Sequence, residues 1–193
     1  KLLSISDVII DNFKPGTLEK YGFSSSYLKK NFPSLIQTKI SGFGETGPLK
    51  GNPAYDMIVQ AMGGIMSITG KNKNETYRVG SSVGDIVAGL YAVIGVLTQI
   101  IFRNQSKKGS RLDLSMLDCQ VAILENAIAR YSVEKKIPYP LGTDHPSITP
   151  FGAFKTLDGA LAIAIGNNKM FKDFCYSIKN EEFNKKKKNM KIM

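Results

Sequence analysis

A long stretch without charge constrains this chain more than any other part of the sequence. Residues 86–102 contain no charged side chain; Asp85 precedes them, and a basic segment, residues 103–111, follows. A membrane span needs about 20 apolar residues, so the stretch is slightly short for one. A helix that is apolar on all sides also occurs in the core of large proteins. We therefore expect a buried core helix, with a membrane span as the alternative.

Shorter apolar runs alternate with helical patterns along the rest of the N-terminal part. We expect strands at residues 7–10, 35–40 and 111–114, because each run is short and either apolar or alternating. Strands that alternate with helices favour an α/β fold with a parallel sheet. The helices that complete this pattern are expected at residues 25–32, 55–68, 85–102 and 115–131.

The pattern changes after residue 134. Residues 135–150 contain four prolines and a glycine, which is typical of a linker. Beyond the linker we expect two strands, 152–156 and 160–165, and a helix at residues 169–178. The predicted organisation is therefore a large domain at 1–134, a linker at 135–150, and the start of a small α+β domain with a Lys-rich tail at 151–193. Because the chain begins at Lys1 rather than Met, we expect a fragment of a longer protein.

The net charge of +10 is unevenly distributed. Residues 179–193 carry six Lys and two Glu, which leaves +6 on the rest of the chain. A Lys run without interleaved aromatic side chains is typical of a solvated end. The remaining charge suits a small anionic ligand as well as a polyanion. A basic nucleic-acid-binding protein is therefore the least favoured alternative.

Few side chains are available for metal or disulfide chemistry. Cys119 and Cys175 lie in apolar helical patterns without paired spacing, and His145 is the one histidine of the sequence. Neither a disulfide nor a zinc site fits this set, so we expect no metal and a reducing, cytoplasmic location. His145 falls in the linker, where a hydrogen-bonded hinge role is favoured over catalysis.

A glycine-rich loop follows the strand at 35–40. Residues 42–48 read GFGETGP, which is neither the dinucleotide-binding fingerprint nor a phosphate loop. In open α/β sheets, however, ligands bind at the carboxyl ends of strands. The loop is therefore either a binding element or a plain tight connection. A second candidate binding element follows the first strand and consists of Asn12, Lys14 and Lys20. These side chains either hold an anionic ligand or are ordinary surface residues.

Two aspartates stand at helix starts in the same S-x-x-D pattern. Residues 82–85 and 115–118 both fit a capping box, in which the acid stabilises the helix N-terminus. Asp85 opens an almost wholly apolar helix and follows Gly84, which leaves room for a substrate. We expect it to lie near the interior, at a helix end that favours its anionic form. Asp85 is therefore the expected reactive carboxylate, and Asp118 the expected helix cap.

Three segments together carry a family resemblance. Residues 7–23 (DVIIDNFKPGTLEKYGF), residues 39–70 (KISGFGETGPLKGNPAYDMIVQAMGGIMSITG) and residues 79–97 (VGSSVGDIVAGLYAVIGVL) follow one another in this order. Over about residues 5–178, the chain resembles the class III CoA-transferases. This family includes formyl-CoA, carnitine and succinyl-CoA:dicarboxylate CoA-transferases as well as the α-methylacyl-CoA racemases.

The resemblance implies a fold and an assembly. Family members have a Rossmann-like large domain built from both chain ends and a small domain joined to it by linkers. Two subunits interlock to form a homodimer. No permanently bound cofactor is implied, since coenzyme A enters with the substrate, and no membrane or nucleic-acid partner is expected.

The resemblance also implies the roles of individual residues. The nucleophilic aspartate of the family falls on Asp85, which would attack an acyl-CoA, become an aspartyl-CoA thioester and pass CoA to a carboxylic acid. A lysine that helps to hold CoA in the family falls on Pro53, so that contact is lost or supplied differently. The positions that contact CoA fall on Asn12, Phe13, Lys14, Lys20, Ala54, Tyr55 and Asp56.

Two alternatives stay open within this resemblance. The racemases pair the aspartate with a histidine for proton transfer at the α-carbon. That histidine falls on Tyr55 here, which we otherwise expect to be a partly buried aromatic residue, so a transferase is favoured. The second alternative is an inactive truncated product, because the residues after Phe183 depart from the family pattern.

Overall fold

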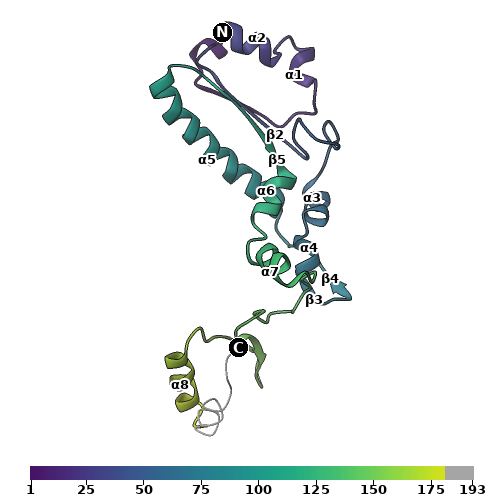
Figure 1. The fold of residues 1–193 in the computed structure, drawn as a ribbon, viewed down its shortest axis with the longest axis vertical. Helices are drawn as coiled ribbons and strands as arrows, with labels where there is room; N and C mark the ends of the chain where they lie inside the picture. The colour runs from purple at the N-terminus through teal and green to yellow at the C-terminus, as the bar shows by residue number, and fades with distance from the viewer. Residues whose placement is uncertain (181–193) are drawn as a thin grey trace. The chain divides into compact units, whose positions relative to one another are not determined.

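Three strands form a parallel sheet in the N-terminal part of the chain (Figure 1). They are β1 (Val8–Asp11), β2 (Ile36–Ser41) and β5 (Arg111–Ser115), in the spatial order β1-β2-β5. Both pairings are parallel, with Asp11 beside Lys39 and Ser41 beside Ser115. The predicted α/β class with a parallel sheet is confirmed. Because the strands are parallel, the segments that follow β1, β2 and β5 all begin at the carboxyl edge of the sheet.

The computed structural model describes residues 1–180 and divides the chain into two units, Lys1–Pro140 and Leu141–Met193. Their boundary lies inside the segment that we interpret as a linker, and the assignment to a large and a small domain stays a prediction. The Lys run at 185–188 lies outside the described residues. The other elements of the first unit are a 3-10 helix (Leu3–Ile5), α1 (Thr17–Lys20), α2 (Ser25–Asn31), α3 (Asp56–Met62), α4 (Ile65–Ile68), β3 (Gly70–Asn72), β4 (Glu75–Thr76), α5 (Val83–Ser106), α6 (Met116–Ala122) and α7 (Asn126–Glu134).

Two helices that the sequence predicts as continuous are broken in the structure. The predicted helix at 55–68 is divided between α3 and α4, where Gly64 adopts a φ of 92°. At Gly63, an added Cβ would lie 2.5 Å from Cγ of Gln120, so this close contact with α6 requires glycine. The predicted helix at 115–131 is divided between α6 and α7, where Glu125 has a φ of 39°. After α4, strands β3 and β4 form a short antiparallel hairpin that the sequence analysis does not predict.

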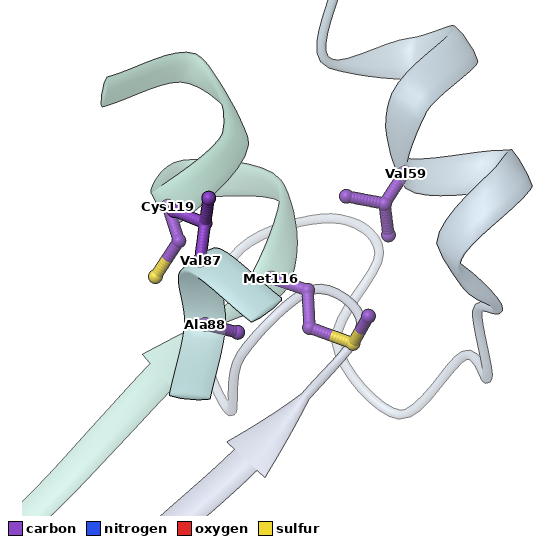
Figure 2. Packing of buried hydrophobic residues seen from close by; sticks show 5 residues of the cluster. All are labelled: Val59, Val87, Ala88, Met116 and Cys119. Carbon is purple, nitrogen blue, oxygen red and sulfur yellow. The ribbon is translucent and has the colours of Figure 1, made fainter. Parts of the chain in front are cut away.

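The core of the first unit lies where α3, α5 and α6 meet. Its buried cluster consists of Val59, Val87, Ala88, Met116 and Cys119, and Figure 2 shows that these side chains come from the three helices. Helix α5 also contacts β2 and β5, and it runs alongside them in Figure 1. The core therefore ties the start of α5 to the sheet.

The prediction that α5 is buried on all sides is wrong for this chain. Only 17% of its most apolar window is buried, and Leu90, Leu97 and Ile101 each expose more than half of their surface. These side chains are exposed because a sheet of three strands covers one face of the long helix and leaves its other face uncovered. By length and hydropathy α5 could cross a membrane, but its packed face is that of a helix in a layered α/β protein. That no membrane partner exists stays a prediction.

The second unit begins with an antiparallel hairpin. Strands β6 (Phe151–Lys155) and β7 (Ala160–Ala164) pair around the predicted turn, and α8 (Asn168–Ser177) follows, capped by Asn167. His145 is held beside this hairpin, where its backbone N–H donates to the carbonyl of Phe151 at 3.0 Å. Its Nδ1 accepts a hydrogen bond from the backbone N–H of Ser147 at 3.2 Å. Within this unit His145 is a hydrogen-bonded structural residue.

The packed cluster generates a stability prediction. Val59 is fully buried, so Val59→Ala should lower the free energy of unfolding by about 2 kcal/mol through lost burial and an unfilled cavity. Val133 is 82% exposed, and Val133→Ala should change it by less than about 0.5 kcal/mol. Urea unfolding of both variants measures the difference. Equal effects would contradict the placement of the core at Val59.

Candidate active site

An open cavity lies at the carboxyl edge of the sheet. Its volume is about 680 Å³, within the range of small-molecule sites. Its walls come from the segments that follow β1 and β2, from the loop before α3, and from the first turns of α5. This is the position at which open α/β sheets bind ligands. A second cavity, of about 60 Å³, lies among the charged side chains of Asp11, Lys39, Glu45 and Arg111 and is too small for a cofactor.

Most of the residues predicted for the site line the large cavity. They come from sequence positions as far apart as 12 and 85, and the sheet edge brings them together. Lys20, on α1, and Asp56, on α3, do not line it. Tyr55 is 85% exposed, not partly buried as predicted, because it precedes α3 and projects away from the core. The predicted residues on the cavity wall are Asn12, Phe13, Lys14, Ala54, Tyr55 and Asp85.

Asp85 lies in the first turn of α5 without taking part in a capping box. The Ser82 side chain makes no capping hydrogen bond, and within the described residues the Asp85 carboxylate has no hydrogen bond or ion pair. Instead, Oδ1 of Asp56 accepts from the backbone N–H of Gly84 at 2.8 Å. Asp85 is exposed on the cavity wall, not near the interior as predicted, because the turn that carries it faces the open edge of the sheet.

The charge of Asp85 is disfavoured by its surroundings. Desolvation by the neighbouring protein, and secondly the negative charge of Asp56, raise the pKa of Asp85 above its ordinary value. A carboxylate with a raised pKa is a stronger base and a better nucleophile once it is ionised. An unpaired carboxylate of this kind in a cavity is a candidate for covalent chemistry.

The Asp118 segment forms the serine half of the predicted capping box, and the Asp118 carboxylate makes no hydrogen bond to the described residues. Oγ of Ser115 accepts from the backbone N–H of Asp118 at 3.2 Å, which caps α6. Asp118 is not among the residues of the cavity wall. The two S-x-x-D segments therefore differ in the structure. Ser115 caps its own helix, α6, whereas the first turn of α5 is capped by Asp56 from α3.

A buried ion pair holds the turn after β1, and sequence reasoning missed it. Lys39 is 8% exposed, and its Nζ pairs with the Asp11 carboxylate and donates to the carbonyl of Phe13 at 2.7 Å. Asp11 also accepts from the backbone N–H of Phe13, and the Asn12 side chain donates to the carbonyl of Ile40 at 3.0 Å. The available signal was a lysine in a predicted strand that, once β1 and β2 pair, lies beside the aspartate at the end of β1. These contacts fix Asn12 and Phe13 on the cavity wall.

The glycine-rich loop combines both of the roles considered for it. Gly42 lines the cavity, and a Cβ there would lie 2.5 Å from the Cβ of Ala54, so the loop packs too closely for any other residue. Farther along the loop, the backbone N–H of Glu45 donates to the Asp113 carboxylate at 2.8 Å. The side-chain carboxylate of Glu45 pairs with Arg111. The loop is thus fastened to β5 and contributes one residue to the wall.

The chain is similar to proteins whose activities have been assigned. Residues 1–192 match the sequence profile described as CoA-transferase family III. The succinate–glutarate CoA-transferase of Agrobacterium fabrum is 39% identical over 175 residues, which are 91% of this chain and 44% of that protein. The acetyl-CoA:oxalate CoA-transferase of Acetobacter aceti is 40% identical over 171 residues, 88% of this chain and 44% of that protein. The chain thus spans less than half the length of these relatives.

A solved structure shows the same fold at a similar level of identity. A CAIB/BAIF family protein from Brucella suis superimposes with a TM-score of 0.84 and is 38% identical. The match covers 95% of this chain and 49% of that protein.

The contrast between the two S-x-x-D segments can be tested by removing each serine hydroxyl. Ser115→Ala should lower the free energy of unfolding by about 1 kcal/mol, because it removes a cap from α6. Ser82→Ala is the matched control and should have little effect, since Ser82 caps nothing. Thermal unfolding of both variants gives the comparison. A loss at Ser82 as large as that at Ser115 would show that α5 is capped by its own serine.

Proposed function

The chain belongs to CoA-transferase family III, and we propose that it carries the nucleophile and part of the CoA site of an enzyme of this family. The proposed enzyme moves coenzyme A from an acyl-CoA to a carboxylic acid. The observation that carries the proposal is Asp85, a carboxylate without a partner among the described residues, on the wall of a cavity at the carboxyl edge of the sheet. The cavity is large enough for the reactive end of a CoA thioester.

The proposed reaction begins with an oxygen of Asp85 attacking the thioester carbonyl. The C–S bond breaks, CoA leaves as a thiolate, and a mixed anhydride remains on Asp85. The thiolate then attacks the Asp85 carbonyl and expels the donor acid, which gives an aspartyl-CoA thioester. The carboxylate of the acceptor acid attacks this thioester, which releases the thiolate and leaves a second mixed anhydride on Asp85. The thiolate then attacks the acceptor carbonyl of this anhydride, forms the new acyl-CoA and expels the Asp85 carboxylate. Asp85 is regenerated, and no oxidant, reductant or net proton transfer is required.

The surroundings of Asp85 support this use of a weak nucleophile. Its raised pKa, caused by partial desolvation and by the charge of Asp56, makes the ionised carboxylate a stronger nucleophile than an ordinary one. The N-terminal turn of α5 places the positive end of a helix dipole where an oxyanion would develop. Gly89 lines the cavity and brings the backbone close without a side chain in the way. Gly84, which the sequence predicted to leave room for a substrate, packs against α3 instead and does not line the cavity.

Coenzyme A would lie along the turn after β1 and the loop before α3. Lys14 offers a positive charge for phosphate, while Phe13 and Tyr55 expose aromatic faces. Asn12 and Ala54 complete this wall. A contact between Lys20 and CoA stays a prediction. Pro53, at the position of a family lysine, also lines the cavity but offers no charge.

The names of the relatives suggest which acids to test first. Succinate, glutarate and oxalate occur among them, so we infer that the acceptor is a dicarboxylic acid and that succinyl-CoA is a suitable donor. We further propose that the complete enzyme has a Rossmann-like large domain, forms an interlocked homodimer and holds no permanent cofactor. The cytoplasmic location stays a prediction.

The covalent role of Asp85 can be tested by trapping. When the full-length protein is incubated with succinyl-CoA and quenched with hydroxylamine, the modified peptide should contain Asp85. Asp85→Ala should lose CoA transfer by several orders of magnitude, since no other described residue of the cavity wall supplies a carboxylate.

The matched control is Asp118→Asn, which changes the same residue type at the start of a neighbouring helix. It should keep its transfer activity and its trapping at Asp85. Undiminished turnover in Asp85→Ala, or hydroxamate on Asp118, would contradict the proposal.

The racemase alternative predicts a different reaction of the same protein. Racemisation needs a base on each face of the α-carbon. Tyr55 occupies the second position here, and a phenol without an activating cation is a poor base at neutral pH. Its hydroxyl makes no hydrogen bond to the described residues. We therefore expect no deuterium wash-in at the α-carbon of a 2-methylacyl-CoA in heavy water. Exchange as fast as CoA transfer would assign the protein to the racemases.

A further inference from the structure

Two buried polar side chains of α3 face the segment that leads into α5. Asp56 and Gln60 lie one helical turn apart and are 9% and 0% exposed. Neither lines the cavity. A buried charge is costly unless hydrogen bonds compensate it, so the partners of Asp56 indicate what it does.

The hydrogen bonds of this pair converge on the residues before Asp85. Oδ1 of Asp56 accepts from the Gly84 N–H at 2.8 Å, and Oδ2 accepts from Nε2 of Gln60 at 2.8 Å. Oε1 of Gln60 accepts from the backbone N–H of Val79 at 2.8 Å, and its Nε2 also donates to the carbonyl of Ser81 at 3.3 Å. The pair thus holds both the loop before α5 and the first turn of the helix.

Gly84 is the residue that allows this approach. A Cβ at this position would lie 3.1 Å from Oδ1 of Asp56 and 3.3 Å from Cγ1 of Val59. The first turn of α5 is therefore seated directly on α3, with Asp85 as the next residue. Its position depends on a contact between residues 56 and 84 that is not local in sequence.

We propose that Asp56, oriented by Gln60, is a positioning residue for Asp85: it holds the Gly84 amide so that the reactive carboxylate projects into the cavity. This inference rests on the proposed function. It differs from the role expected from the resemblance, in which Asp56 contacts CoA, because the carboxylate is directed at Gly84 and away from the cavity.

Asp56 also supplies a charge that acts on Asp85. Of the titratable groups around the start of α5, it is the one whose charge raises the pKa of Asp85, after desolvation. The other groups lie on the elements packed against this end of α5 or on the cavity wall. They are Lys39 on β2, Arg111 and Asp113 on β5, Asp118 and Cys119 on α6, and Lys14 and Tyr55 on the wall.

Two substitutions in the full-length protein separate position from charge. Asp56→Ala removes the acceptor of the Gly84 amide, and kcat should fall about 100-fold because the nucleophile is misplaced. KM for the acyl-CoA should change by less than about threefold, since Asp56 does not bind the substrate. Asp56→Asn keeps an acceptor oxygen for the Gly84 amide but loses the hydrogen bond from Nε2 of Gln60, so it should recover part of this loss.

The pH profile provides a readout that a purely structural role would not change. Asp56→Asn removes the negative charge that raises the pKa of Asp85, so the acid limb of kcat should move to lower pH. Asp118→Asn, which removes a carboxylate charge at the start of α6, should leave the acid limb in place. Thermal unfolding of each variant separates these effects from misfolding.

The outcomes distinguish this inference from the proposed function. If hydroxylamine traps Asp85 in the unaltered protein but Asp56→Ala raises KM and keeps kcat, Asp56 binds substrate and the positioning role is wrong. An unchanged acid limb in Asp56→Asn would contradict the effect of the Asp56 charge on Asp85. If Asp85 is never trapped in the unaltered protein, both proposals fail together. A lowered kcat, a nearly constant KM and a shifted acid limb support the inference.

Discussion

The hydrogen bond between the Asp56 carboxylate and the Gly84 amide determines where α5 begins. Helix α5 contacts α3, α6 and two strands of the sheet, so its first turn fixes the geometry around the cavity. A helix start needs partners for its free N–H groups, and these commonly come from the residue just before it. Here the partner comes from another helix, which couples the position of Asp85 to the core around Val59.

Two carboxylates in this arrangement have opposite environments. The Asp56 carboxylate is buried, and hydrogen bonds from an amide N–H and a glutamine compensate its charge. Asp85 has no such partner among the described residues and faces the cavity, where the charge of Asp56 adds to its desolvation. Environments that differ in this way separate the roles of two acids of the same type. In our account one acid maintains the geometry and the other performs the chemistry.

Local patterns in the sequence predicted much of the fold but less of the site. Short apolar or alternating runs predicted β1, β2 and β5, and the charge-free stretch predicted α5, because these signals depend on neighbouring residues. The break between α3 and α4 follows from the contact of Gly63 with Gln120, which lies far along the chain. The Asp56–Gly84 contact is also non-local, and no pattern around either residue indicated it. The Lys39–Asp11 pair can be predicted only from the pairing of β1 with β2. The exposure of one face of α5 depends on how many strands cover the helix. The hydrophobic periodicity of the sequence does not predict that number.

The central claim is that Asp85 takes the CoA group covalently and is regenerated with an oxygen from the acceptor acid. Isotope labelling tests this most directly, because each turnover leaves an acceptor oxygen in the Asp85 carboxylate. The full-length protein would be incubated with succinyl-CoA and a dicarboxylic acid labelled with oxygen-18, then digested for mass spectrometry. The account predicts that heavy oxygen accumulates in the peptide that contains Asp85 and in no other. CoA transfer that proceeds while this peptide stays unlabelled would contradict it.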